Sequence, residues 1–173
     1  MRKLQIIPYL LVFFIILIVL AFIPFQRAIV FQPNHSQVEL AYIPIKDETL
    51  FQIKYTHSIH LSDVIESFKI TPANLIQLYE LMYEDFAIGM PANAEEGETF
   101  EQRGGAYYIK NMKREFPFFH LRIGQVRANH KVIFKNIEYP LNRSIKPGTS
   151  VKVEIRKLNF LKLWKGVNIL ESI

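Results

Sequence analysis

Residues 6–25 form an unbroken apolar run, and no charged side chain occurs between Lys3 and Arg27. At about 1.5 Å of rise per residue, a helix of about 20 residues spans the ~30 Å hydrocarbon core of a bilayer. The segment Ile6 to Phe25 is therefore predicted to be an uncleaved transmembrane signal anchor. The alternative is a cleavable signal peptide, whose apolar region is usually about 7–15 residues long and precedes a site of small residues.

The positive charges that flank this run predict its orientation. The N-terminal amine, Arg2 and Lys3 precede the run, whereas Arg27 follows it alone. By the positive-inside rule, the N-terminus lies in the cytoplasm and the rest of the chain outside the cell membrane. Residues 28–36 are predicted to be a short tether, and residues 37–173 a single extracytoplasmic domain.

Beyond the tether, apolar and polar positions mostly alternate with a period of two, and β-branched and aromatic residues are frequent, which predicts strands. The predicted strands are residues 38–42, 50–56, 63–70, 74–83, 106–110, 118–123, 131–137 and 151–158. The fourth segment also fits the spacing of a helix. About eight short strands predict an all-β domain, either a β-sandwich or a partly open barrel.

Two segments depart from this alternation. Residues 84–105 are rich in Gly and Glu and are predicted to be a long acidic loop, which in a compact domain is functional or mobile. The turn at Lys146-Pro147-Gly148 is short by comparison. Residues 158–173 keep many apolar side chains, so they form either a last strand or an amphipathic segment on the sheet or at the membrane.

The amino-acid composition excludes several kinds of functional site. The chain contains no cysteine, which excludes disulfides, thiolate metal sites and cysteine nucleophiles. Its formal net charge of +5 is spread along the sequence rather than gathered in a patch. That distribution suits a domain near an anionic membrane and argues against a nucleic-acid partner. No cofactor is expected.

The densest group of polar side chains reads as a hairpin with a tight turn. If residues 61–62 are the central pair of that turn, His60 lies opposite Asp63 and His57 lies opposite Glu66 on one side of the sheet. A carboxylate opposite an imidazole fixes its tautomer and raises its pKa. The simpler interpretation is structural: the histidine and the carboxylate form a hydrogen-bonded pair that stabilises the hairpin.

The same residues allow two chemical interpretations. Ser58 with His57 and Glu66 supplies the components of a hydrolase, although neighbours in a strand point to opposite faces. His57, His60 and Glu66 are weak candidates for a metal site. An exported hydrolase or metal-dependent enzyme that uses His57 and Glu66 is therefore the alternative to a non-enzymatic domain.

Two further motifs are candidates for a functional surface. Gly89 and Pro91 mark a sharp change of chain direction, where the main chain can approach a partner closely. Arg122 ends an apolar run two residues before Gly124. Its guanidinium suits either an ion pair with Glu66 or an acidic ligand.

Taken together, these motifs resemble a family of small bacterial proteins known as domain of unknown function 1850. The motifs that carry the resemblance are His57-Ser58 with Val64 and Glu66, Gly89-Met90-Pro91, Leu121-Arg122-Ile123-Gly124, and Asn129-His130. The resemblance covers most of residues 50–158. Ala87-Ile88 stands where a second glycine is common in the family.

The resemblance implies a context in membrane transport. Such proteins are similar to exported partners of the TAXI-type TRAP transporters, in which a solute-binding protein delivers substrate to a membrane permease. A membrane-anchored accessory domain that contacts the permease or the solute-binding protein is the leading hypothesis, and an envelope-assembly module is a further alternative.

Overall fold

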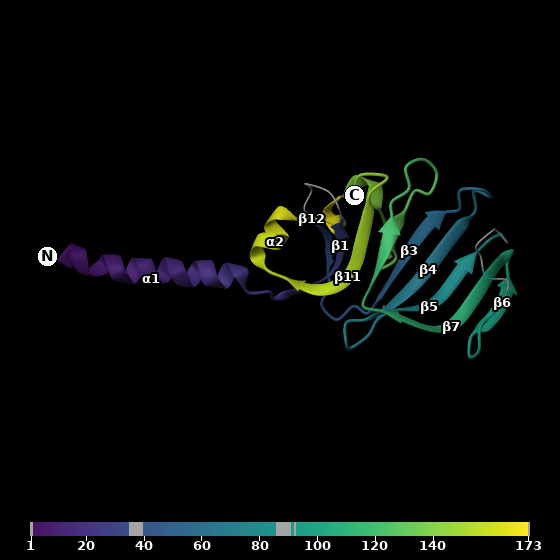
Figure 1. Cartoon of the computed structure of the whole chain (residues 1–173), viewed down its shortest axis with the longest axis horizontal. Helices are drawn as coiled ribbons and strands as arrows, with labels where there is room; N and C mark the ends of the chain where they lie inside the picture. Colours follow the sequence, from purple (N-terminus) through teal and green to yellow (C-terminus); the bar gives the residue numbers. More distant parts are fainter. Residues whose placement is uncertain (1, 35–39, 86–90, 92, 173) are drawn as a thin grey trace.

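The computed structural model describes residues 2–34, 40–85, 91 and 93–172, with side chains from residue 9 onward. Helix α1 (Arg2–Phe22) begins the chain and extends away from two packed β-sheets (Figure 1). Its side chains over residues 9–20 are exposed. Within the described part of the chain, no helix has the length and apolarity required to cross a membrane.

Twelve strands of the described chain form the two sheets, and every pairing is antiparallel except that of β12 with β2. The smaller sheet has the order β12 (Val167–Asn168), β2 (Ala41–Pro44), β1 (Gln26–Pro33), β11 (Ser150–Leu158) and β8 (Phe118–Arg122). The larger sheet has the order β10 (Ile137–Pro140), β9 (Lys131–Phe134), β3 (Leu50–Thr56), β4 (Asp63–Ile70), β5 (Ile76–Tyr83), β7 (Ala106–Phe116) and β6 (Thr99–Arg103). The prediction of a mostly β domain after an N-terminal helix is confirmed.

The main core lies between the two sheets. Alternate side chains of β1 and β3, such as Ile29 and Ile53, are fully buried there. Phe68 of the larger sheet stacks on Phe51 at 5.1 Å and on Phe119 of the smaller sheet at 5.0 Å between ring centroids. Burying one such ring contributes about 1.5–3 kcal/mol, so this stack joins the two layers.

Strand β1 corrects the prediction of a tether at residues 28–36. Ala28, Ile29, Val30 and Phe31 are all fully buried, because β1 lies inside the smaller sheet between β2 and β11. Ile29 and Phe31 face the main core, whereas Ala28 and Val30 face a second cluster under helix α2 (Phe160–Lys165). A strand buried on both faces loses the alternation by which strands are recognised.

Two other segments differ from their predicted form. Residues 131–137 are not one strand but the start of a hairpin, because Lys135 and Asn136 both take positive φ, at 52° and 62°, in the two-residue turn between β9 and β10. The predicted acidic loop contains strand β6. The described part of the segment 158–173 contains both predicted alternatives, because the end of β11 is followed by helix α2, which packs on the smaller sheet, and then by the short strand β12 and the 3₁₀ turn η2 (Ile169–Glu171). Another 3₁₀ turn, η1 (Leu141–Arg143), follows β10.

Candidate functional site

The turn between β3 and β4 has six residues rather than two, and we call residues 57–62 the hairpin tip. The backbone N–H of His57 donates to the carbonyl of Ser62 at 2.8 Å, and that of Leu61 donates to the carbonyl of His57 at 3.0 Å. Leu61 has a φ of 58°, in the left-handed region. The tip therefore closes as a wide loop in which the last strand pair is Thr56 opposite Asp63.

This register corrects the predicted pairing of the two histidines with carboxylates. Glu66 lies opposite Ile53, not opposite His57, and Asp63 lies opposite Thr56, not opposite His60. The wider turn moved the partner of Glu66 by four positions along β3. The enzyme alternative loses the His57–Glu66 pair on which it depended.

The two histidines of the hairpin tip nevertheless lie close together. The rings of His57 and His60 are 5.9 Å apart between centroids, and Nδ1 of His57 accepts a hydrogen bond from the backbone N–H of Ile59 at 3.4 Å. Ser58 is exposed beside them. In the part of the chain that the structure describes, no group of three or more His, Asp or Glu side chains is arranged to hold a metal ion.

Glu66 points to the inner face of the larger sheet, where its neighbours along β4, Val64 and Phe68, are buried core residues. Burial raises the pKa of its carboxyl above the ordinary value. Among the described residues, no hydrogen bond or ion pair to its carboxylate is found. An ionisable group in this apolar position costs folding free energy, so Glu66 is an unusual side chain for the core.

Tyr55 connects Glu66 to His130. Tyr55 lies opposite Val64, so it is the diagonal neighbour of Glu66 on the same face. Burial, and then the charge of Glu66, raise the pKa of Tyr55 to about 12. The ring of Tyr55 stacks on that of His130, with 5.3 Å between centroids and 22° between planes.

His130 is held by Gly124. The backbone N–H of Gly124 donates to Nδ1 of His130 at 3.1 Å, so the neutral ring carries its proton on Nε2. Burial lowers the pKa of His130, which favours this neutral form. A Cβ on residue 124 would lie 2.4 Å from Cβ of Ala128, so only glycine allows the loop to close this tightly.

Three side chains and one backbone N–H group thus form a continuous set, which we call the inner polar cluster: Glu66, Tyr55, His130 and Gly124. Three of its members were predicted as candidates, and the structure brings them together. Tyr55 was missed, because its stack on His130 depends on the pairing of β9 with β3, which no local pattern shows. Its alternation with Ile53 along β3 is the pattern that places it on the inner face.

Arg122 is not part of this cluster. Its side chain is exposed at the end of β8, opposite Ser150, because the alternation that buries Ile123 turns Arg122 outward. No ion pair with Glu66 is found among the described residues. Arg122 lies instead in a groove of about 490 Å³ with Lys146 and Gly148.

The segment after Pro91 packs through Ala94 on the inner face of the larger sheet, and we call residues 93–98 the strap. The hydroxyl of Tyr83 donates to the carbonyl of Pro91, and Ala94 packs on the cluster around Tyr83. Arg114 pairs with Glu95 at 2.8 Å and with Glu98 at 3.2 Å. The strap is therefore a fixed cover; Gly89, the other candidate of this motif, lies outside the described residues.

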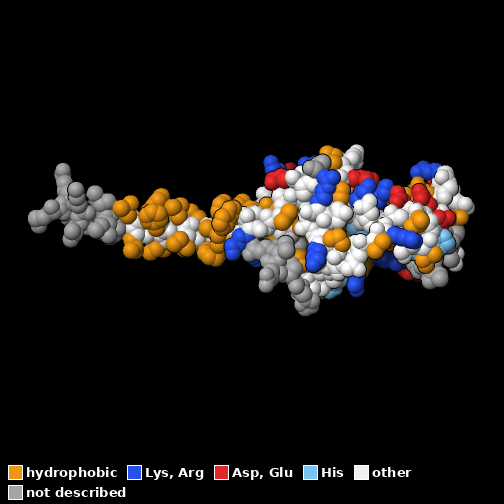
Figure 2. All heavy atoms as spheres, turned by 90° about the horizontal axis from the view of Figure 1, so that it is seen from above, with side chains coloured by type: hydrophobic (Ala, Val, Ile, Leu, Met, Phe, Trp, Pro, Cys, Tyr) orange, Lys and Arg blue, Asp and Glu red, His pale blue; other side chains and the backbone are white. Residues whose placement is uncertain are grey.

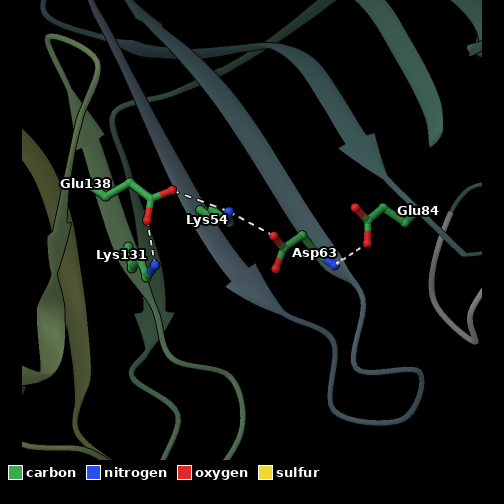
Figure 3. Close-up of polar contacts among 5 residues, drawn as sticks. All are labelled: Lys54, Asp63, Glu84, Lys131 and Glu138. Atoms are coloured by element: carbon green, nitrogen blue, oxygen red, sulfur yellow. Dashed lines mark hydrogen bonds and ion pairs between the residues drawn. The ribbon is translucent and has the colours of Figure 1, made fainter. Parts of the chain in front are cut away.

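The outer face of the larger sheet carries a chain of charges (Figure 3). Nζ of Lys54 lies 2.8 Å from Asp63 and 3.3 Å from Glu138, and Lys131 pairs with the other oxygen of Glu138. The backbone N–H of Asp63 donates to Glu84 at 3.1 Å. The hydrogen bond that Lys54 donates to Asp63 raises the pKa of Lys54, and the hydrogen bond that Lys131 donates to Glu138 lowers the pKa of Glu138.

Residues 51–141, more than half of the 173-residue chain, match the family model described as Domain of unknown function (DUF1850). The chain belongs to this family. No curated protein and no solved structure matches it. The DUF1850 match begins in β3 and ends just after β10, so it contains the seven strands of the larger sheet together with β8.

The inner polar cluster, the hairpin tip and the strap all lie within the DUF1850 match. Strands β1, β2, β11 and β12 lie outside it and build the smaller sheet with β8. The residues that could carry a function common to the DUF1850 family are therefore concentrated on the larger sheet and its connections.

Proposed function

We propose that this DUF1850 protein is a membrane-anchored accessory domain on the outer side of the membrane, where it docks the permease or the solute-binding protein of a TAXI-type TRAP transporter. The segment Ile6 to Phe25 serves as its anchor. The partner class comes from the family resemblance, and the anchor from the chain itself.

One observation carries the proposal: apolar helix α1 leads almost directly into β1, a central strand of the smaller sheet. Only residues 23–25 separate the two elements. The backbone N–H of Phe25 donates to the carbonyl of Leu158 at 3.1 Å, and Nδ2 of Asn159 donates to the carbonyl of Phe22 at 3.2 Å. A domain joined this closely to an anchor stays at the membrane surface.

The exposed apolar side chains of α1 support the anchor. Tyr9 is 76% exposed and Phe22 is 59% exposed, and the helix reaches away from both sheets (Figure 1). In water such a helix would present a large unbroken apolar surface, whereas lipid tails would cover it at no cost. Tethering also raises the effective concentration of the domain near any partner in the same membrane.

The hairpin tip supports a protein partner. Ile59 is 62% exposed and Leu61 is 58% exposed, and both lie beside the two histidines of a loop fixed by its own hydrogen bonds. Large apolar side chains on a rigid, polar-rimmed projection suit a contact with another protein. On the strap, the exposed carboxylate of Glu96 adds negative charge that would complement a basic partner surface.

Site-directed photo-crosslinking in native membranes tests the docking surface. A photoreactive residue at Ile59 is expected to capture a permease or a solute-binding protein of the TRAP class. The same residue at Leu50, which is 54% exposed at the opposite end of β3, is the matched control and should capture neither. Capture of only unrelated envelope proteins at Ile59 would refute the transporter partner. Release of the full chain from membranes by alkaline washing would refute the anchor.

A further inference from the structure

Helix α2 lies beside the point where α1 meets the sheets (Figure 1). The side chain of Asn159 joins the two helices: Oδ1 caps α2 by accepting from the N–H of Lys162 at 2.9 Å, and Nδ2 donates to Phe22 of α1 at 3.2 Å. The residue before it, Leu158, accepts a hydrogen bond from Phe25. The short helix is thereby held level with the last turn of α1.

The orientation of α2 is fixed by its contacts with the smaller sheet. Leu163 packs on the cluster of Leu40 and Tyr42, and the hydroxyl of Tyr42 donates to the carbonyl of Leu163 at 3.1 Å. Gly166 ends the helix so close to the sheet that a Cβ there would lie 2.9 Å from Cδ1 of Leu40. Because one side of α2 packs on the sheet, the other side faces away from the domain.

The exposed side of α2 is aromatic and basic. Phe160 is 54% exposed and Trp164 is 73% exposed, and their spacing of four residues places them on the same side of the helix. Lys162 and Lys165 are exposed on the same short helix. Aromatic rings beside lysines are typical of the boundary between lipid tails and headgroups.

A groove of about 400 Å³ lies where the end of α1, helix α2 and the smaller sheet meet, and it is lined by Phe22, Leu40, Leu161 and Lys162 among others. Figure 2 shows basic side chains where the apolar helix meets the body of the protein. The groove thus has an apolar floor at the level where α1 ends and a basic rim. Its chemistry is complementary to an anionic phospholipid, which offers acyl carbons and a phosphate.

We propose that α2 is a second membrane contact, in which Phe160 and Trp164 enter the headgroup layer and Lys162 and Lys165 bind the phosphates of anionic lipids. This inference rests on the anchoring of α1 proposed above, and it adds the orientation of the domain relative to the membrane surface. With two contacts, the domain lies on the membrane in one pose instead of turning about a single helix.

Trp164 is the only tryptophan in the chain, so its fluorescence reports this contact directly. The full chain is reconstituted in phosphatidylcholine vesicles with and without phosphatidylglycerol. We expect blue-shifted emission, quenching by lipids brominated near the headgroup, and protection from aqueous acrylamide, all stronger with the anionic lipid. K162E/K165E should weaken the contact by roughly fivefold per lysine.

The matched control is R127E/K146E, which makes the same change of charge at exposed positions away from α2, Lys146 lying before the opposite end of β11. It should leave the quenching unchanged, and thermal unfolding should show that both double variants are folded. Equal loss of quenching in the control would overturn the assignment to α2, because net charge alone would then explain the effect.

An alkaline wash of the same vesicles separates this inference from the proposed function. If the chain is washed off, the anchor is refuted and the inference falls with it. If the chain remains but Trp164 is open to acrylamide and unaffected by brominated lipid, only the lipid contact is refuted. Protection from acrylamide without quenching by brominated lipid would show that a second copy of the chain covers the aromatic face, which also overturns the proposal.

Discussion

The central strand of the smaller sheet, β1, is covered on both faces, whereas β3 of the larger sheet is covered on one. Strand β1 of the smaller sheet has the main core on one side and α2 with its cluster on the other. Strand β3 of the larger sheet buries Phe51 and Ile53 but turns Lys54 and its charge network toward solvent. Residues 28–31 of β1 are accordingly all apolar, whereas β3 alternates apolar and polar side chains. The ionisable groups of the smaller sheet lie on the neighbouring strand β11, where Glu154 pairs with Lys152 and Arg156.

This difference coincides with the limits of the DUF1850 match. The matched region forms the larger sheet, which holds the inner polar cluster, the hairpin tip and the strap. The flanking segments form most of the smaller sheet, which joins α1 and α2 to the domain. Under the proposed function, the smaller sheet joins the domain to its anchor, and the hairpin tip of the larger sheet contacts the partner.

Removing an aromatic side chain from the smaller sheet should have the largest effect. Phe31 is fully buried at the centre of β1, so Phe31→Ala creates a cavity that the surrounding strands can only partly close. A loss of about 3–5 kcal/mol in the free energy of unfolding is expected from chemical denaturation. The control Leu50→Ala, at an exposed position of the larger sheet, should change it by less than about 1 kcal/mol.

A smaller loss is expected from His130→Phe in the larger sheet. Phenylalanine keeps the stack on Tyr55 but cannot accept the hydrogen bond from Gly124. An unpaired N–H in a half-buried loop costs about 1–3 kcal/mol. The control is His120→Phe, an exposed position on β8 of the smaller sheet, which should be nearly neutral.

The pH dependence of this variant provides a second measurement. Because burial lowers the pKa of His130, the unfolded chain binds a proton at a higher pH than the folded chain does. Stability from this group is therefore complete above the ordinary histidine pKa of about 6.5 and is lost as the pH falls toward the lowered value. His130→Phe should lack this acid-side loss. An identical pH profile in both proteins would contradict the neutral, buried His130.

Local patterns predicted the interior of the strands well and their connections poorly. Residues 50–56 and 63–70 alternate clearly and became β3 and β4 within those limits. The register between them depended on the turn, and no local pattern distinguishes a two-residue turn at 61–62 from the six-residue tip in which Leu61 takes positive φ. An error in one turn therefore moved the partner of Glu66 from Ile53 to His57.

The opposite failure occurred at β1. The run Ala28 to Phe31 is apolar without alternation, because both of its faces are covered by segments far away in the sequence, the larger sheet on one side and helix α2 on the other. Burial on two sides is a tertiary property, so the sequence alone led to the prediction of a tether. The position of Gly124 under His130 likewise depends on a loop closure that the sequence motif marks but does not describe.

The smallest effect, and one of opposite sign, is expected from Glu66→Gln. Burial raises the pKa of Glu66, so the folded chain binds a proton at a higher pH than the unfolded chain does, and the wild-type protein loses stability as the pH rises from the ordinary glutamate value through the raised one. Glutamine carries no charge and lacks this loss. The gain in melting temperature at pH values above the raised pKa should be modest, because the carboxylate is only partly buried and water screens it.

The control Glu80→Gln, on the outer face of β5, should show no such pH-dependent gain. If Glu66→Gln is instead destabilising at neutral pH, the carboxylate has a stabilising partner, and the inner polar cluster contributes to folding as a hydrogen-bonded network of the larger sheet.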